Sequence, residues 1–246
     1  MATDIKNDVG LSSNLVSYWE FEEASGTRVD SHGSNDLSDN NTVLQGTGLQ
    51  GNCADFESSN DEFLTISDAS QTDLDPGTSD FTIAFAVKWE SHTTTTGLVT
   101  KGTTSGNFGY RIIWQTSSGG RMRMQTSSTG SSWTNADWSW SPVDGTWYYM
   151  AFVKSGSTVT WYRDAVSQTA KSAQATVNNN NQHFTIGSSA SGTQANDMDG
   201  LIDELGFWKR ALTSTEISDI YNSGSLIPYD AGGVSTPIFI PKVAVI

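Results

Sequence analysis

Apolar and polar residues alternate with a period of two along much of the chain, which is typical of strands with one buried face. The segment 81–89, FTIAFAVKW, is the clearest case. It places five large apolar side chains on one face: Phe81, Ile83, Phe85, Val87 and Trp89. The other face receives Thr82, Lys88 and two alanines. This segment is predicted to be a strand that borders a core.

Similar runs occur in pairs that are separated by short turn segments. The runs 110–115 and 121–126 are joined by TSSGG, and the runs 146–155 and 158–164 are joined by GS. Each pair predicts a β-hairpin. Two further strands are predicted at 183–189 and 198–208, and the spacers are rich in Gly, Ser, Asn and Thr. Many short strands with such spacers predict a β-sandwich or a barrel.

One helix is expected near the end of this pattern. Thr213 and Glu216 have the spacing of a capping box, in which each side chain bonds the backbone N–H of the other residue. Ile217, Ile220 and Tyr221 follow at helical spacing. The helix is short, and we expect it to cover the sandwich.

The two ends differ from the body of the chain. Residues 1–12 are mostly polar and are predicted to be a leader, and residues 13–227 are predicted to be the folded domain. Residues 228–246 form a segment rich in apolar residues that Pro237 and Pro241 interrupt. Because proline cannot donate to a strand ladder, this segment suits an edge strand or an arm that adds to a neighbouring protein or a second copy. A disordered terminus is the alternative.

Composition limits the classes of function. The chain of 246 residues suits one large all-β domain, and its formal net charge is −14. Nucleic acids and anionic membranes need basic patches, so neither is an expected partner. The charge is compatible with cations and neutral sugars, and also with a role in solubility alone. No segment suits a membrane span, no signal peptide is visible, and the single Cys53 excludes an internal disulfide.

The order of motifs resembles that of the laminin-G-like, concanavalin A-like lectin and glucanase jelly rolls. The resemblance covers roughly residues 13–227 and rests on five segments in series: 15–36, 51–66, 73–89, 142–166 and 199–224. It implies an all-β, two-sheet antiparallel jelly-roll sandwich with one short C-terminal helix. One turn departs from the family pattern, because Asp164 is followed by Ala165 rather than by glycine. That turn is expected to be strained or of another type.

The resemblance also implies a structural calcium ion. The residues that match are Asp203 in the closing strand, with Glu22 and Asp30 near the first strand. Backbone carbonyls would complete the oxygen shell. The alternative is that Asp203 accepts hydrogen bonds from backbone amides and that Glu22 faces solvent.

Glycoside hydrolases of the laminarinase type share this jelly roll. Their acids alternate along one strand as Glu-x-Asp-x-x-Glu, and no such run is present. The sequence also has no nucleophile elbow and no phosphate loop. A non-enzyme is therefore the primary prediction, and a glycoside hydrolase, active or degenerate, is the alternative.

Sugar binding has a better candidate in the polar segment 131–145, which is expected to be a loop. Aromatic rings stack on sugars, and amide and carboxylate groups bind hydroxyls. The candidate ligand-binding residues are Trp133, Asn135, Asp137, Trp138 and Trp140. Packing of these tryptophans is the alternative, and the other six tryptophans are expected to be buried.

Together these features predict a non-catalytic recognition or structural module that binds carbohydrate. An extracellular or virion-surface location is expected, as an adhesion module or as a decoration of a capsid or tail.

Overall fold

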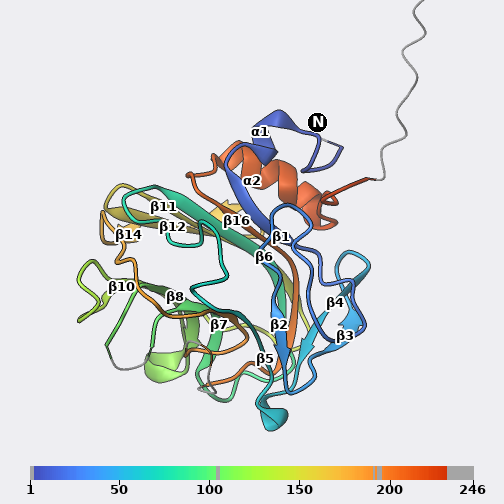
Figure 1. The fold of residues 1–246 in the computed structure, drawn as a ribbon, viewed down its shortest axis with the longest axis horizontal. Coiled ribbons are helices and arrows are strands. Elements are labelled where there is room, and N and C mark those ends of the chain that lie inside the picture. The colour runs from blue at the N-terminus through green and yellow to red at the C-terminus, as the bar shows by residue number, and fades with distance from the viewer. Residues whose placement is uncertain (1–2, 104–105, 191, 193–195, 232–246) are drawn as a thin grey trace, which may run out of the picture.

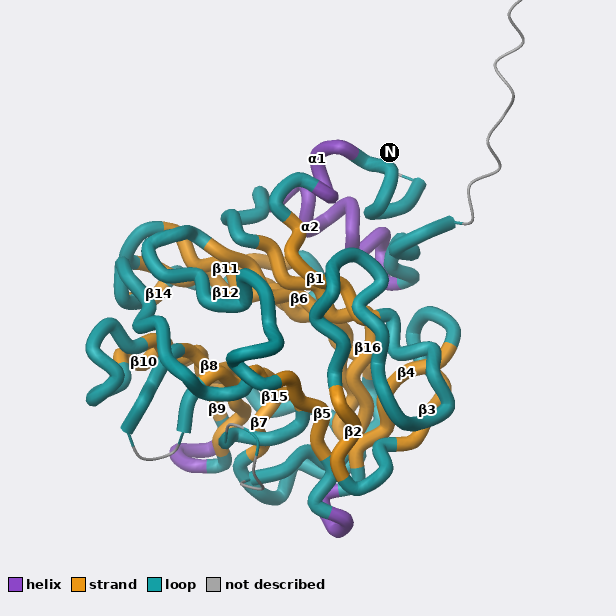
Figure 2. Tube along the Cα trace, viewed as in Figure 1, coloured by secondary structure: helices purple, strands orange, loops and turns teal. Residues whose placement is uncertain are grey.

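The computed structural model describes residues 3–103, 106–190, 192 and 196–231, and they form a sandwich of two antiparallel sheets (Figures 1 and 2). This confirms the all-β jelly roll that the sequence predicted. Every strand pair that the structure describes is antiparallel, so short turns and crossing loops make the connections.

The first sheet has the order β13-β12-β11-β6-β16-β4-β3, with β1 beside β16 and β14 beside β12. Its strands are β1 (Leu15–Trp19), β3 (Leu44–Thr47), β4 (Asn52–Phe56), β6 (Phe81–Trp89), β11 (Trp147–Ser155), β12 (Thr158–Arg163), β13 (Val166–Ser167), β14 (Lys171–Ser172) and β16 (Gly200–Trp208). The predicted hairpin of 146–155 and 158–164 is β11 and β12. The strand predicted at 198–208 is β16, which lies in the middle of this sheet.

The second sheet has the order β10-β9-β8-β7-β15-β5-β2. Its strands are β2 (Ser38–Asn40), β5 (Phe63–Ile66), β7 (Thr96–Lys101), β8 (Tyr110–Gln115), β9 (Arg121–Thr126), β10 (Thr134–Ser139) and β15 (Phe184–Ile186). The second predicted hairpin is β8 and β9, which pair residue by residue. The run predicted as a strand at 183–189 forms only the short β15.

The core lies between the sheets and is rich in aromatic rings. Trp19, Trp89, Trp114 and Trp161 are buried there as predicted. Trp147 differs, because it is half-buried outside this core, where the ammonium group of Lys88 lies 5.2 Å from its ring centroid.

A second apolar cluster covers the outer face of the first sheet. Ala84 and Ala86 of β6 face α2 (Ser214–Tyr221), whose Ile217 and Ile220 are buried against them. The capping box of Thr213 and Glu216 is present, which confirms the predicted helix start. Small residues on β6 leave room for the helix, so this sheet is buried on both faces.

The segment predicted as a leader packs into the same cluster. It contains the short helix α1 (Val9–Ser12), and Ile5 and Leu11 are buried. The amides of Ile5 and Lys6 donate to the carbonyls of Pro228 and Tyr229. Residues 5–12 and 226–229 therefore pack as one layer with α2, whereas 232–246 lie outside the described residues.

A β-bulge interrupts β16 between Asp203 and Gly206, where Glu204 has a φ of 51°. The bulge inserts one residue into the alternation. Ile202 and Leu205 therefore both face the core, while the buried Asp203 points to the opposite face. Three 3-10 turns complete the fold, at Ser58–Asn60, Ser117–Gly119 and Asn222–Gly224. No helix in the described part of the chain has the length and apolar character that crossing a bilayer requires.

Candidate functional site

The outer face of the second sheet carries a regular array of polar side chains. Alternate residues of β8, β9 and β10 face the core, so those between them face outward. The outward positions form three cross-strand rows: Arg111, Gln125 and Asn135; Ile113, Arg123 and Asp137; Gln115, Arg121 and Ser139. We call these nine positions the arginine face. The three strands lie side by side in Figures 1 and 2.

Hydrogen bonds across the strands hold the side chains of the arginine face in place. Arg111 Nε donates to Gln125 Oε1 at 2.5 Å, and Gln125 Nε2 donates to Asn135 Oδ1 at 2.6 Å. Arg123 binds both carboxylate oxygens of Asp137, at 2.5 and 2.8 Å, and Arg121 Nη1 adds a bond of 3.0 Å. These bonds lower the pKa of Asp137, Arg123 contributing most. The groups are thus preorganised.

Trp133 lies at one end of the arginine face, just before β10. Its half-buried ring stacks on Phe108 at a centroid distance of 4.5 Å, and the guanidinium carbon of Arg111 lies 4.9 Å from its centroid. Trp133 therefore combines an aromatic surface with a neighbouring cation and amide groups.

Of the five predicted sugar-binding residues, the structure brings Trp133, Asn135 and Asp137 to this face. The prediction that 131–145 is a loop is wrong for 134–139, which form β10. Trp138 lies on the core side of that strand, is only 6% exposed, and donates its Nε1–H to Thr169 O. Trp140 packs edge-on against Trp161 in the same core. The ring of Trp138 offers no face to a sugar.

The three predicted calcium ligands do not gather at one point. Asp30 is buried, and its two oxygens accept hydrogen bonds from the backbone amides of Tyr18, His32, Gly33 and Asn35. Those four bonds use its oxygens to hold the loop after β1 against the first strand. Asp30 therefore does not fit a metal-ligand role.

Asp203 and Glu22 share a location at the turn 48–52. Asp203 Oδ2 accepts bonds from the amides of Leu49 and Gln50, and Glu22 binds the amide of Asn52. These two hydrogen bonds agree with the alternative given above, in which Asp203 accepts hydrogen bonds from backbone amides. Its Oδ1, however, is buried with no hydrogen-bond partner among the described residues. Burial raises the pKa of Asp203 to about 7 despite these amides. An orphan buried oxygen beside a second carboxylate fits a cation ligand pair.

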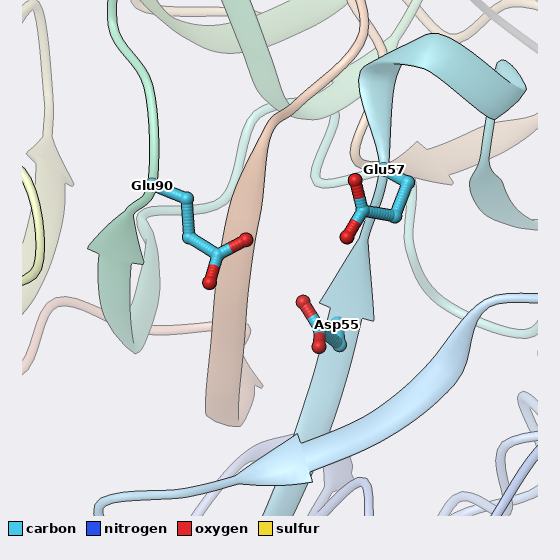
Figure 3. A group of neighbouring side chains, drawn as sticks. All are labelled: Asp55, Glu57 and Glu90. Carbon is cyan, nitrogen blue, oxygen red and sulfur yellow. The ribbon is translucent and has the colours of Figure 1, made fainter.

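The structure gathers a different group of acids, Asp55, Glu57 and Glu90. Their carboxylate oxygens lie within 4.8 Å of one another, and their side chains converge from the ends of β4 and β6 (Figure 3). Desolvation raises the pKa of each carboxyl group, and the charges of neighbouring acids raise it further. Three hard oxygen donors this close together are suitable for a divalent cation.

A hollow of about 390 Å³ beside the start of β1 is a further candidate. His32, Asn35, Asp73 and Lys209 are among the residues that line it. Asp73 and Lys209 form an ion pair of 2.6 Å. None of its described lining residues is Trp, Tyr or Phe, so the hollow lacks the apolar ring surfaces that usually line ligand sites.

The three arginines and the acidic group were not among the predicted site residues. The signal for the arginines was present, because the run RMRMQT alternates arginine with buried methionine and so places Arg121 and Arg123 on one outer face. The acids come from segments far apart in the sequence, and no local pattern brings Glu90 to Asp55 and Glu57.

A sandwich of two antiparallel sheets places the chain in the jelly-roll class of β-proteins. A family model described as the concanavalin A-like lectin/glucanases superfamily, Laminin_G_3, matches residues 58–218. The chain belongs to this family. A comparison with curated proteins finds no match.

Among solved structures, the fold is similar to domain 4 of AbnA, a GH43 extracellular arabinanase from Geobacillus stearothermophilus, in complex with arabinotriose. That match has a TM-score of 0.63 and 19% identity, and covers 84% of this chain and 97% of the domain. The binding domain of Paraclostridial Mosquitocidal Protein 1 has a TM-score of 0.67 and 16% identity, with coverages of 85% and 52%. The binding domain of botulinum neurotoxin DC in complex with SialylT has a TM-score of 0.65 and 13% identity, with coverages of 86% and 52%.

Two of these structural neighbours are complexes, with arabinotriose and with SialylT, and both toxin structures are binding domains. The chain spans about half the length of the two toxin domains. At this level of identity the likeness shows the fold.

Proposed function

We propose that this protein is a non-catalytic module that binds glycans through the arginine face and Trp133. The observation that carries the proposal is the half-buried Trp133 beside preorganised amide and guanidinium groups on one partly exposed sheet face. Aromatic rings provide apolar contact, and fixed donors and acceptors select hydroxyl positions. The glycan complexes of two structural neighbours support the same class of ligand.

A glycan array followed by isothermal titration calorimetry of each hit tests this proposal. Trp133→Ala and Asn135→Ala are expected to weaken binding by on the order of tenfold, because each removes a direct contact of about 1 kcal/mol or more. Trp147→Ala is the matched control, since Trp147 is also half-buried but lies on the other sheet. Equal loss in the control variant, or no hit on the array, would contradict the proposal.

The hydrolase alternative predicts a different result. Retaining glycosidases use two carboxylates about 5–5.5 Å apart, and the acids that come close together here are Asp55, Glu57 and Glu90. A reducing-sugar assay against β-glucans and arabinan is expected to show no release. Release that Glu57→Gln or Glu90→Gln abolishes would replace the binding module with an enzyme.

We also propose a structural calcium ion at Asp203 and Glu22. The buried orphan Oδ1 of Asp203 supports it. Calcium is expected to raise the melting temperature, and Asp203→Asn is expected to remove that response. Glu57→Gln is the control, because it changes the other acidic group. If only Glu57→Gln loses the response, the calcium site is assigned to Asp55, Glu57 and Glu90 instead. If the melting temperature of the native chain responds to neither calcium nor chelator, the proposal is rejected.

An extracellular or virion-surface location remains part of the proposal, because glycan ligands are found on such surfaces.

The C-terminal arm is also proposed to take part in assembly, and the structure shows where a deletion that tests this role should begin. Tyr229 is buried and stacks on Tyr18 at 5.0 Å, so a deletion must begin after it. Removing 232–246 is expected to lower the mass measured by light scattering to that of a single chain. The same oligomeric state before and after the deletion would exclude the arm.

A further inference from the structure

Arg111 differs from the other arginines of the arginine face, because its hydrogen-bond partners among the described residues are all neutral. Arg121 and Arg123 share the carboxylate of Asp137. The guanidinium of Arg111 donates instead to Gln125 Oε1 and to the carbonyl of Ser189, and it lies over the Trp133 ring. A half-buried cation without a carboxylate is unfavourable in a folded protein, because its desolvation is only partly offset.

The groups around Arg111 do not compensate for the positive charge of its guanidinium group. Burial and, to a smaller extent, the positive charge of Arg123 together lower the pKa of Arg111 to about 10. Among the described residues, no acid raises this pKa. The arginine face thus holds three guanidinium groups and one carboxylate, within a chain whose net charge is −14. Positive charge is therefore concentrated where the chain as a whole is strongly acidic.

The groups around Arg111 suit the chemistry of an acidic sugar. Its planar guanidinium is suited to a carboxylate, which it binds through paired hydrogen bonds. Asn135, which is exposed, adds an amide group in the same row that suits ring hydroxyls, whereas the buried Gln125 holds Arg111 and Asn135 in place. Trp133, whose ring both Phe108 and Arg111 contact, adds the part of its aromatic surface that remains exposed.

We infer that the arginine face binds a carboxylated sugar, with the carboxylate on Arg111 and the sugar ring beside Trp133. This inference rests on the proposed glycan-binding function and names the chemical class of its ligand. Arg121 and Arg123, which Asp137 partly neutralises, supply a positive field around the bound acid. The acidity of the rest of the chain works against such a ligand at long range, so binding depends on the short-range contact with Arg111.

Matched pairs of probes test the inference by calorimetry. Trigalacturonate is compared with its fully methyl-esterified form, and 3′-sialyllactose is compared with its sialic acid methyl ester, so that each pair differs in the charge of the carboxylate. We expect at least one acid to bind on the order of tenfold or more tightly than its neutral counterpart. The acid that binds distinguishes a uronic from a sialic acid source.

Variants assign the effect to Arg111. Arg111→Gln is expected to reduce the affinity for the acid to that of the neutral counterpart, and Arg111→Lys is expected to retain part of it, because lysine keeps the charge but loses the paired geometry. Lys6→Gln removes one exposed charge elsewhere and is expected to change nothing. An unchanged melting temperature shows that a variant is folded. If Arg111→Gln fails this check, the affinity of Arg111→Lys decides the test in its place.

Two results would overturn the inference, and they differ in whether they also reject the proposed glycan-binding function. Equal affinity for acid and neutral counterpart, unchanged in Arg111→Gln, would reject the acidic ligand and leave the proposed glycan-binding function standing. Absence of binding to any glycan, acidic or neutral, would reject the proposed function together with the inference.

Discussion

At the scale of single residues, the acidic side chains differ in the groups that compensate for the cost of burying their charge. Asp30 is stabilised by four backbone amides, Asp137 by two arginines, and Asp203 by two amides with one oxygen left over. The sequence marks Asp203 as an unusual acid within an apolar strand, and Asp30 was named only through the family resemblance. The sequence did not show which amides face them, because those amides belong to turns whose position depends on the whole fold.

Ala165 provides a test of backbone strain. It follows Asp164 in the turn between β12 and β13, and φ is 61° at Ala165 and 52° at Asp164. The strained turn predicted from the missing glycine is therefore a turn with two positive φ angles. Ala165→Gly is expected to raise the free energy of unfolding by about 0.5–1 kcal/mol, measured by chemical denaturation. Ala170→Gly, whose φ is negative, should have no effect or lower stability, and the opposite ranking would show that the turn is unstrained.

Asp137 provides a test of the charge network in the proposed site. The bonds from Arg123 and Arg121 keep its folded pKa below the ordinary value of 3.8. The stability that this carboxylate contributes is thus present above pH 3.8 and is lost only as the pH falls through the lowered pKa. Carboxyl NMR of Asp137 is expected to show this low value and a clear rise in Arg123→Gln. A native pKa at or above 3.8 would mean that the network does not hold in solution.

At the scale of elements, strands with regular alternation could be predicted and interruptions could not. The segment FTIAFAVKW gave β6 with its correct core face, and RMRMQT gave β9. In β16 the bulge at Glu204 shifts the alternation, so the sequence alone does not show which of its residues share a face. The polar character of 131–145 predicts a loop, whereas residues 134–139 form β10, and the outward face of that strand is polar because it meets solvent.

The helix α2 was predictable because its signals are local. Thr213→Ala removes the hydroxyl that accepts the Glu216 amide, and it is expected to lower the free energy of unfolding by about 1 kcal/mol. Thr215→Ala, at an exposed position inside the helix, is expected to be neutral or slightly stabilising. Denaturant titrations compare the two variants. Equal effects would show that the cap does not anchor this helix.

At the scale of the whole molecule, the two sheets have different surroundings. The outer face of the first sheet is buried under α2, α1 and the residues near Tyr229, whereas the arginine face of the second sheet carries partly exposed polar side chains. This asymmetry places the proposed binding site on the second sheet. Local alternation indicates the face of each strand, but only the order of the strands brings Arg111, Gln125 and Asn135 into one row.

The central claim is that glycans bind to the arginine face, and a backbone amide NMR titration with a glycan array hit tests it most directly. We expect shift changes that saturate and that are confined to β8, β9, β10 and the residues around Trp133. Saturating changes at the turn 48–52, at Asp55 and Glu90, or around the hollow beside β1, with β8–β10 unaffected, would contradict the claim.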